Sequence, residues 1–158
     1  MIEIRDATDD DGEALLLVLG AAFSEYPPCL MERGEYPELA RPRTSFTERG
    51  GLLWVVEDHF GVVGCAGVTP SVEADLCELK KLYLLPRARG RGVAGQLVKL
   101  AECFAVSLGR SRVHLYSDAR FVHAHRRYEQ LGYKRLDDVR ALGDVSQSIE
   151  LHFEKRVD

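Results

Sequence analysis

The segment Arg87-Ala88-Arg89-Gly90-Arg91-Gly92 constrains this 158-residue chain more than any other stretch. It follows an apolar run that ends at Pro86, and it precedes residues 93–108, which have the apolar periodicity of an amphipathic helix. Glycines let a backbone approach an anion closely, and the free N–H groups and dipole of a helix N-terminus favour negative charge. A strand, a glycine turn and a helix in this order predict a site for a phosphorylated ligand.

The predicted elements belong to a mixed sheet. We expect strands over 2–5, 52–57, 62–68, 72–85, 112–117, 132–136 and 148–154, and helices over 13–23, 38–49, 93–108 and 121–131. The expected fold class is α/β of the α+β type, with a mixed, mostly antiparallel central sheet flanked by helices, in one domain over residues 1–158. A P-loop is missing, and we expect no dinucleotide-binding fingerprint because the chain does not alternate βαβ. Nucleotide hydrolysis and hydride transfer are therefore disfavoured.

Composition limits the partners. The formal net charge of -4 disfavours a nucleic-acid binder that relies on a broad cationic face. The apolar run 14–23 is too short to cross a membrane, and the four cysteines form no C-x-x-C pair. His123 and His125 diverge by about 200° on a helix, so they cannot share a metal ion. We expect a cytoplasmic protein with reduced cysteines, mostly in the core, that uses no metal and acts on small molecules.

Residues 82–98 carry a more specific pattern. Leu82-Tyr83-Leu84-Leu85-Pro86 precedes the glycine turn and Val93-Ala94-Gly95-Gln96-Leu97-Val98 follows it, and the combination resembles the R-x-x-G-x-G/A signature of the GCN5-related N-acetyltransferase (GNAT) superfamily. The resemblance implies acetyl-CoA as co-substrate, with its pyrophosphate on the amides of the turn and its pantetheine arm along the preceding strand. The cofactor-binding residues it implies are Leu82, Leu84, Leu85, Arg87, Arg89, Gly90, Arg91, Gly92, Val93 and Ala94.

Glu78 is the candidate general base. An acceptor amine with a pKa near the ~10.4 of lysine is almost entirely protonated at neutral pH, so its transfer needs a base nearby. Two-residue alternation places Glu78 on the strand face of Lys80, Leu82 and Leu84, the face expected to contact pantetheine. The resemblance implies that a glutamate here acts as base, usually through a water. The alternative is that Glu78 only pairs with a neighbouring lysine.

Tyr128 is the candidate general acid. It lies in Ala124-His125-Arg126-Arg127-Tyr128-Glu129-Gln130-Leu131-Gly132-Tyr133, which resembles the family's A-x-x-x-Y-x-x-x-G-[FY] segment. There the tyrosine hydroxyl reaches the departing sulfur; the alternative is a tyrosine that only packs in the core. The family frequently has asparagine three residues before the alanine, where this chain has Phe121. Asp118 or Arg120 are candidates to replace that contact.

The expected reaction is direct transfer of the acetyl group to a primary amine of a small molecule, with a backbone amide of residues 82–84 polarising the carbonyl. The alternatives are a protein N-terminus or lysine as acceptor, and a non-catalytic coenzyme A-binding module. We expect the proline-rich segment 26–42 to form a lid over a small acceptor. The acidic residues in this segment and directly before it are candidates to receive a cationic amine, namely Glu25, Glu32, Glu35 and Glu38. The last strands are also compatible with a homodimer.

Overall fold

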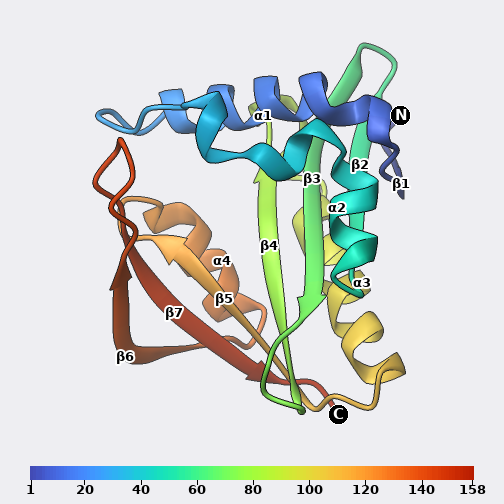
Figure 1. Ribbon diagram of the computed structural model, residues 1–158, viewed down its shortest axis with the longest axis vertical. Helices are drawn as coiled ribbons and strands as arrows, with labels where there is room; N and C mark the ends of the chain where they lie inside the picture. The colour runs from blue at the N-terminus through green and yellow to red at the C-terminus, as the bar shows by residue number, and fades with distance from the viewer.

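The computed structural model describes residues 1–158, and its centre is one seven-stranded sheet with the order β1-β2-β3-β4-β5-β7-β6 (Figure 1). All neighbouring strands are antiparallel except β4 and β5. The strands are β1 Glu3–Asp6, β2 Leu52–Asp58, β3 Gly61–Pro70, β4 Leu76–Leu84, β5 Arg112–Asp118, β6 Lys134–Ala141 and β7 Ile149–Arg156. The predicted fold class is confirmed.

The helices cover both faces of this sheet (Figure 1). They are α1 Gly12–Ser24, α2 Pro42–Glu48, α3 Val93–Ser107 and α4 Val122–Gln130, with 3-10 turns η1 Asp9–Asp11, η2 Arg33–Glu35, η3 Pro37–Ala40 and η4 Pro86–Ala88. The helix predicted over 38–49 is divided into η3 and α2. Pro42 starts α2, because a proline ring fits the first turn of a helix but interrupts its interior.

Two apolar cores lie on opposite faces of the sheet. One packs the inner face of α3 against the sheet and includes Val68, Leu79 and Leu97. The other lies under α1 and α2 and includes Leu19 and Phe46. Three cysteines are buried and all four are free thiols, but Cys103 is exposed on α3 and does not belong to the core. None of the helices has the length and apolar composition needed to cross a membrane.

One expectation about connectivity is wrong. β4 and β5 are parallel and α3 connects them, so this part of the chain is a βαβ unit. Gly90, Gly92 and Gly95 also have the G-x-G-x-x-G spacing of a dinucleotide fingerprint. The antiparallel neighbours β3 and β7 keep this unit from extending into a doubly wound sheet.

The parallel strands β4 and β5 separate part of the way along. Their ladder joins residues 76–78 to residues 112–114, and beyond Glu78 and His114 it has no further pairs. Figure 1 shows β5 and β7 diverging from β4 above this point. The edge of β4 that faces β5 therefore has no strand partner over residues 79–84.

A β-bulge at Lys81 reverses the faces of β4. Its φ is 57°, and the pairing with β3 steps from Lys80–Gly67 to Tyr83–Cys65, which leaves one extra residue on β4. Beyond the bulge Leu82 and Leu84 therefore pack against the core on the α3 side, whereas Glu78 and Lys80 face the side of α1 and α2. The prediction that Glu78 shares a face with Leu82 and Leu84 is wrong, because the extra residue shifts the two-residue alternation.

Candidate active site

A first cleft, of about 730 Å³, lies between the C-terminal half of β4, the glycine turn, α3 and α4, and we call it the α3–α4 cleft. Seven of the ten cofactor-binding residues expected from the sequence line it, together with Tyr128: Leu82, Leu84, Arg89, Gly90, Gly92, Val93 and Ala94. Leu85, Arg87 and Arg91 do not line it. The sequence therefore located most of this cleft.

The glycine turn leaves backbone donors free in the cleft wall. Gly90 and Gly92 both have φ of 75°, a left-handed conformation that favours glycine, and a Cβ at either would meet open space. Gly92 caps α3 without a side-chain hydrogen bond, and no N–H from Gly90 to Gly92 donates to a backbone carbonyl. Free N–H groups at the start of a long helix suit a phosphorylated ligand.

Two of the three arginines of this turn already have acidic partners. Arg89 binds Glu25 through two contacts of 2.7 Å and also donates to the carbonyl oxygen of Leu84. Arg87 donates to Asp58 at 2.8 Å, and this guanidinium lowers the pKa of Asp58 to about 2. Arg91 is exposed and makes no ion pair. The positive charge inferred from the sequence is thus largely balanced within the chain.

α4 and its N-cap add residues to this cleft. Phe121, at the position that the family resemblance marked, lines it together with His123 and Arg127. The guanidinium of Arg127 lies over the first turn of α3, where a Cβ at Gly95 would come within 3.3 Å of it, and the sequence did not indicate this residue. Arg127 has no acidic partner. Its place one residue before Tyr128, on the face that also carries Ala124, is the signal that identifies it. 

The two candidates to replace the missing asparagine do not reach the α3–α4 cleft. Asp118 and Arg120 bind each other at 2.7 Å, and neither lines this cleft. Phe121 itself stacks on Phe23, with ring centroids 6.2 Å apart, and lies against Tyr26. The position usually held by an amide is therefore part of an aromatic cluster.

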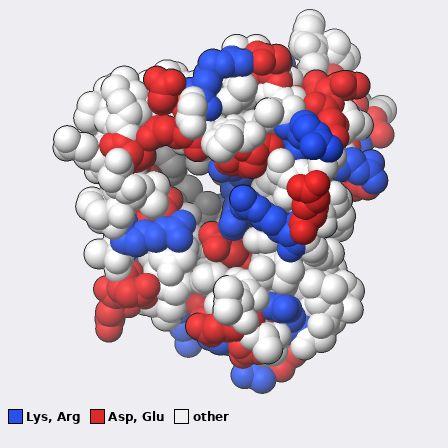
Figure 2. Space-filling view, in the orientation of Figure 1, with Lys and Arg blue, Asp and Glu red and all other residues white.

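A second cleft, of about 540 Å³, opens on the other side of β4, and we call it the α2–β6 cleft. It is lined by η2, η3, α2, the N-terminal half of β4, β6 and the loop after β6. Figure 2 shows this face of the molecule, hollowed below the segment that follows α1, with acidic and basic side chains mixed around the hollow. Glu78 lines this cleft, and so do two cations without an acidic partner, Lys80 and Arg49.

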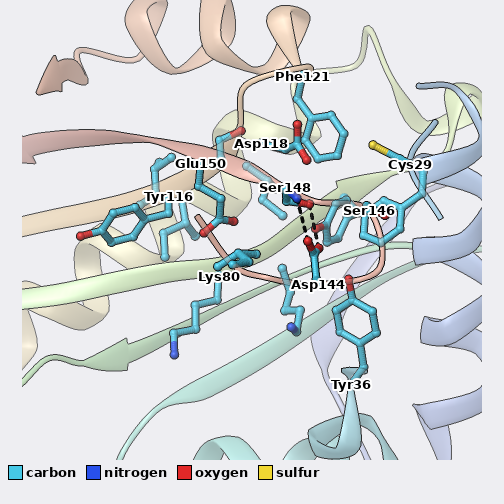
Figure 3. A pocket seen from close by; sticks show the side chains of 18 of the residues that line it. Cys29, Tyr36, Lys80, Tyr116, Asp118, Phe121, Asp144, Ser146, Ser148 and Glu150 are labelled. Atoms are coloured by element: carbon cyan, nitrogen blue, oxygen red, sulfur yellow. Dashed lines mark hydrogen bonds between the residues drawn. The ribbon is translucent and has the colours of Figure 1, made fainter. Parts of the chain in front are cut away.

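An inner cavity of about 90 Å³ lies between the two clefts (Figure 3). It shares Leu82, Phe121 and Tyr128 with the α3–α4 cleft, and it shares Lys80 and Tyr116 with the α2–β6 cleft. The gap between β4 and β5 is what makes room for this passage. Both clefts therefore meet where the two strands separate.

Tyr128 lies at the meeting point. It is buried, packs edge-on against Phe153 and lines both the inner cavity and the α3–α4 cleft. Burial raises the pKa of Tyr128 to about 12, with the Ser117 hydroxyl acting in the opposite direction. Its hydroxyl is therefore a proton donor over the whole neutral range.

The Glu78 carboxylate makes no hydrogen bond. The nearest basic side chains are His114 at 3.9 Å and Arg140 at 4.0 Å from its oxygens. The alternative that it pairs with a lysine is wrong: Lys81 binds Glu38 at 2.8 Å, and Lys80 has no acidic partner. A carboxylate at a cleft wall without a fixed partner is able to accept a proton.

The acidic residues of segment 25–38 are all engaged by the chain itself. Glu25 pairs with Arg89, Glu38 with Lys81, and Glu32 accepts from the Gly34 N–H. Glu35 accepts from the N–H of Val145 at 2.9 Å. Glu25 and Glu38 are thus neutralised by cations of the chain, whereas Glu32 and Glu35 accept only from neutral N–H groups and keep their negative charge, and Glu35 lines the α2–β6 cleft.

Groups suited to a metal ion are missing near the clefts. The structure contains no cluster of three or more His, Cys, Asp or Glu side chains arranged to hold one. His123 is exposed, whereas His125 is buried and contacts the Ser117 hydroxyl at 3.2 Å. The two histidines point to different surroundings, as their spacing on one helix requires.

Known proteins share this arrangement. Residues 49–135, more than half of the chain, match the family model described as acetyltransferase (GNAT) domain. The uncharacterized N-acetyltransferase YjgM of Escherichia coli is 33% identical over 139 residues, which are 85% of this chain and 83% of that relative. A GNAT acetyltransferase structure from Staphylococcus aureus superposes over 100% of both chains with a TM-score of 0.85 at 15% identity.

A further structure contains the co-substrate. The acetyltransferase yncA of Salmonella typhimurium, solved with its cofactor acetyl-CoA, superposes with a TM-score of 0.74 at 17% identity, over 99% of this chain and 94% of that one. The α3–α4 cleft, with its free turn amides, fits such a ligand. The family match, the identity to YjgM and the shared fold agree: this chain belongs to the GNAT family and is an acetyl-CoA-dependent N-acetyltransferase.

Proposed function

We propose that the protein transfers the acetyl group of acetyl-CoA directly to a primary amine of a small molecule, with Glu78 as general base and Tyr128 as general acid. The observation that carries this proposal is the meeting of two clefts at Tyr128, one lined by the glycine turn and the other by Glu78. Acetyl-CoA occupies the α3–α4 cleft in this proposal, and the acceptor occupies the α2–β6 cleft.

The cofactor is held by residues of three elements. The turn amides of Gly90 and Gly92 and the first amides of α3, at Val93 and Ala94, face the pyrophosphate, since these donors have no backbone partner. Leu82 and Leu84 line the path of the pantetheine arm, and Arg89 and Arg127 supply cations beside it. Leu85 precedes the turn, and Arg87 and Arg91 belong to it; these three residues act by supporting its conformation and charge.

The unpaired edge of β4 polarises the acetyl carbonyl. Beyond Glu78 no residue of β5 pairs with β4, so over residues 82–84 the edge of β4 that faces the gap has no strand partner, while the other edge pairs with β3. A backbone N–H fixed in this way stabilises the negative charge that develops on the carbonyl oxygen. Tyr128, on the opposite wall, donates its hydroxyl proton to the departing sulfur.

The closure of the acceptor side supports a small acceptor. Segment 26–42 is tied to the loop after β6, because the N–H of Leu30 donates to Ser146 Oγ at 2.7 Å and that of Val145 donates to Glu35. These bonds connect the two walls of the α2–β6 cleft over about a hundred residues of sequence. A roof of this kind leaves room for a compact amine and little for a polypeptide.

A thiol-release assay tests the proposal. Acetyl-CoA is offered with a panel of primary amines, comprising free amino acids, spermidine, an aminoglycoside, and peptides with a free N-terminus or a free lysine. We expect release with at least one small amine and none with the peptides. Preferred release with a peptide would contradict the small acceptor, and tight acetyl-CoA binding with no release from any amine would indicate a non-catalytic binding module.

A further inference from the structure

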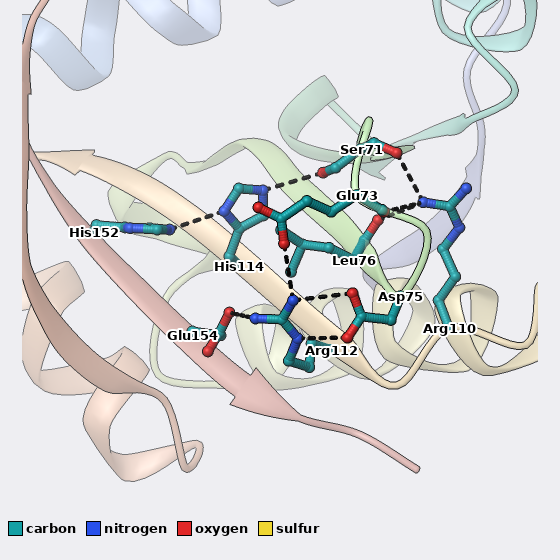
Figure 4. Close-up of polar contacts among 9 residues, drawn as sticks. All are labelled: Ser71, Glu73, Asp75, Leu76, Arg110, Arg112, His114, His152 and Glu154. Carbon is teal, nitrogen blue, oxygen red and sulfur yellow. Dashed lines mark hydrogen bonds and ion pairs between the residues drawn. The ribbon is translucent and has the colours of Figure 1, made fainter.

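Four polar side chains form a continuous hydrogen-bonded row behind Glu78, and we call it the His114 row. Ser71 Oγ lies 3.1 Å from His114 Nε2, and His114 Nδ1 lies 2.8 Å from His152 Nε2 (Figure 4). His152 Nδ1 in turn lies 2.8 Å from a carboxylate oxygen of Asp138. The row crosses from the turn before β4 through β5 and β7 to the exposed surface of β6.

The chemistry of these groups fixes where the ring protons lie. The Asp138 carboxylate only accepts, so Nδ1 of His152 carries a proton and donates it. A neutral His152 then accepts at Nε2, which requires a proton on Nδ1 of His114. The Nε2 atom of a neutral His114 is therefore left with a lone pair, which receives the Ser71 hydroxyl and lies 3.9 Å from the Glu78 carboxylate.

The two imidazole rings have fixed orientations. Tyr116 stacks on His152 with ring centroids 4.2 Å apart and planes 8° from parallel, and it meets His114 edge-on. The Arg140 guanidinium covers the other side of Tyr116 at 3.7 Å. His114 is buried below this layer and does not line either cleft, so it reaches the acceptor only through Glu78.

Burial keeps His114 neutral at rest. It lowers the pKa of His114, and His152 acts in the same direction, while the carboxylates of Glu78, Glu154 and Glu73 act in the opposite one. The charged and titratable groups around this ring therefore come from every element that packs on it, and they are Glu73, Glu78, Tyr116, Asp138, Arg140, His152 and Glu154. A neutral imidazole beside an acidic side chain is ready to take a proton.

The reaction leaves one proton for the enzyme to hold. As the N–C bond forms and the C–S bond breaks, the nitrogen of an ammonium acceptor gives up two protons. One of them replaces the proton that Tyr128 gives to the departing sulfur, and the other stays with the protein until water removes it. The ordinary pKa of an imidazole is about two units above that of a carboxylic acid. Burial reduces this margin for the pKa of His114, and the negative charge of an ionised Glu78 acts to restore it.

We propose that His114 takes over the proton that Glu78 removes from the acceptor, and that His152 and Asp138 hold His114 in the tautomer that can receive it. The proton passes from the Glu78 carboxyl oxygen to His114 Nε2, which leaves Glu78 ionised beside an imidazolium. When the product has left, the proton returns through Glu78 to water in the open cleft, and the resting tautomers are restored. Glu78 has no hydrogen bond that restrains its rotation across the 3.9 Å gap.

This proposal rests on the proposed function, with Glu78 as base, and makes His114, His152 and Asp138 positioning residues for it. The row offers a test at its exposed end, because Asp138 lies at the surface and its replacement leaves the core intact. Asp138→Asn removes the terminal charge. Asp137→Asn is the matched control, since Asp137 is the neighbouring exposed residue of β6 and makes no hydrogen bond or ion pair.

The first measurement needs no acceptor. The ¹⁵N shifts of the histidine rings are followed by NMR against pH in the full-length protein and both variants. We expect the Nδ1–H tautomer for neutral His114 in the wild type, and a titration midpoint of His114 that falls by roughly half a unit in Asp138→Asn but not in Asp137→Asn. An Nε2–H tautomer, or the same midpoint in all three proteins, overturns the proposal.

The second measurement uses the amine that releases thiol fastest in the panel. We expect Asp138→Asn to lower kcat about fivefold with the acetyl-CoA KM unchanged, to move the acidic limb of the pH profile to lower pH, and to have no further effect in a Glu78→Gln background. Unchanged kcat and pH profile in Asp138→Asn, with normal wild-type turnover, overturn this proposal alone. A wild type that acetylates no amine overturns the proposed function and this proposal with it.

Discussion

Glu25 and Arg89 join the C-terminal end of α1 to the glycine turn through two contacts of 2.7 Å, and both side chains line the α3–α4 cleft. The carboxylate holds the guanidinium of the arginine that directly precedes Gly90. A phosphorylated ligand in this cleft thus meets an arginine that is already paired, next to a negative charge.

We expect Glu25→Gln to tighten acetyl-CoA binding. The change frees Arg89 and removes a repulsive charge, and an exposed pair of this kind contributes about 0.2–1 kcal/mol, which corresponds to at most about fivefold in Kd. Calorimetric titration at low and high salt measures the effect, and the gain should shrink at high salt. Glu13→Gln, which breaks the exposed pair of Glu13 with Arg33 elsewhere on α1, is the control. Weaker binding in Glu25→Gln would show that the pair shapes the cleft instead of competing with the ligand.

Tyr128→Phe should lower kcat about 100-fold or more and leave acetyl-CoA affinity nearly unchanged, because only the proton donor is removed. Initial rates of thiol release measure kcat, and a direct binding titration measures the affinity for acetyl-CoA. Tyr133→Phe is the matched control: its hydroxyl donates to Glu102 at 2.9 Å, away from both clefts. That control should cost about 1 kcal/mol of unfolding free energy without loss of turnover. Full activity in Tyr128→Phe would remove Tyr128 from the mechanism.

The raised pKa of Tyr128 predicts the alkaline end of the pH–rate profile. Because burial raises this pKa to about 12, the hydroxyl keeps its proton at pH values where an ordinary tyrosine, with a pKa of about 10, would lose it. We therefore expect that ionisation of Tyr128 does not lower kcat near pH 10. Any decline of kcat near pH 10 should be present in both the wild type and Tyr128→Phe. Profiles of both proteins, measured over the range in which circular dichroism shows them folded, test this. A tyrosine-dependent decline near pH 10 would contradict it.

Glu78→Gln should lower kcat/KM about 100-fold at neutral pH, and the deficit should shrink as the pH approaches the pKa of the acceptor amine. At that pH the free amine no longer needs a base, so the variant regains activity while the wild type gains little. Glu48→Gln changes an exposed glutamate of α2 that has no partner and serves as control. A deficit that stays constant with pH would assign Glu78 to acceptor binding instead of proton transfer.

Gly92→Ala should weaken acetyl-CoA binding and also cost about 1 kcal/mol of unfolding free energy, because its φ of 75° strains any residue with a Cβ. Gly109→Ala is the matched control. Gly109 follows the other end of α3, has φ of 73° and likewise has open space around its missing Cβ. The midpoint temperature of thermal unfolding should fall similarly in both variants, whereas only Gly92→Ala should raise the acetyl-CoA Kd. Equal Kd values would exclude the turn from cofactor binding.

The sequence predicts the local elements of this fold well, because each depends on its own neighbours. The glycine turn, the start of α3 at Val93 and the hairpin of β2 and β3 all follow from residues close in the chain. The strand expected over 72–85 begins only at Leu76, since residues 71–75 form a turn in which the carbonyl oxygens of Ser71 and Glu73 accept hydrogen bonds from Arg110. Strand β6 runs to Ala141 because β7 pairs with it, a contact that its own charged sequence does not indicate.

The features missed in the candidate site depend on residues far apart in the sequence. Arg89 pairs with Glu25, 64 residues away, and His114 contacts His152, 38 residues away. No pattern of neighbouring residues predicts either contact. The bulge at Lys81 was missed for a different reason. A lysine in a left-handed conformation carries no signal comparable to a glycine, so simple alternation put Glu78 on the wrong face.

The bulge at Lys81 also divides β4 into two halves that can vary separately. Glu78, before the bulge, lines only the α2–β6 cleft, and Lys80 lines that cleft and the inner cavity, whereas Leu84, beyond the bulge, lines only the α3–α4 cleft. With the acceptor and the cofactor in the two clefts as proposed, substitutions in the first half alter the choice of acceptor without disturbing the cofactor, and the second half can stay constant while new acceptors are acquired. Because of this single extra residue, β4 can vary in the residues before Lys81 while the residues after Lys81 stay the same.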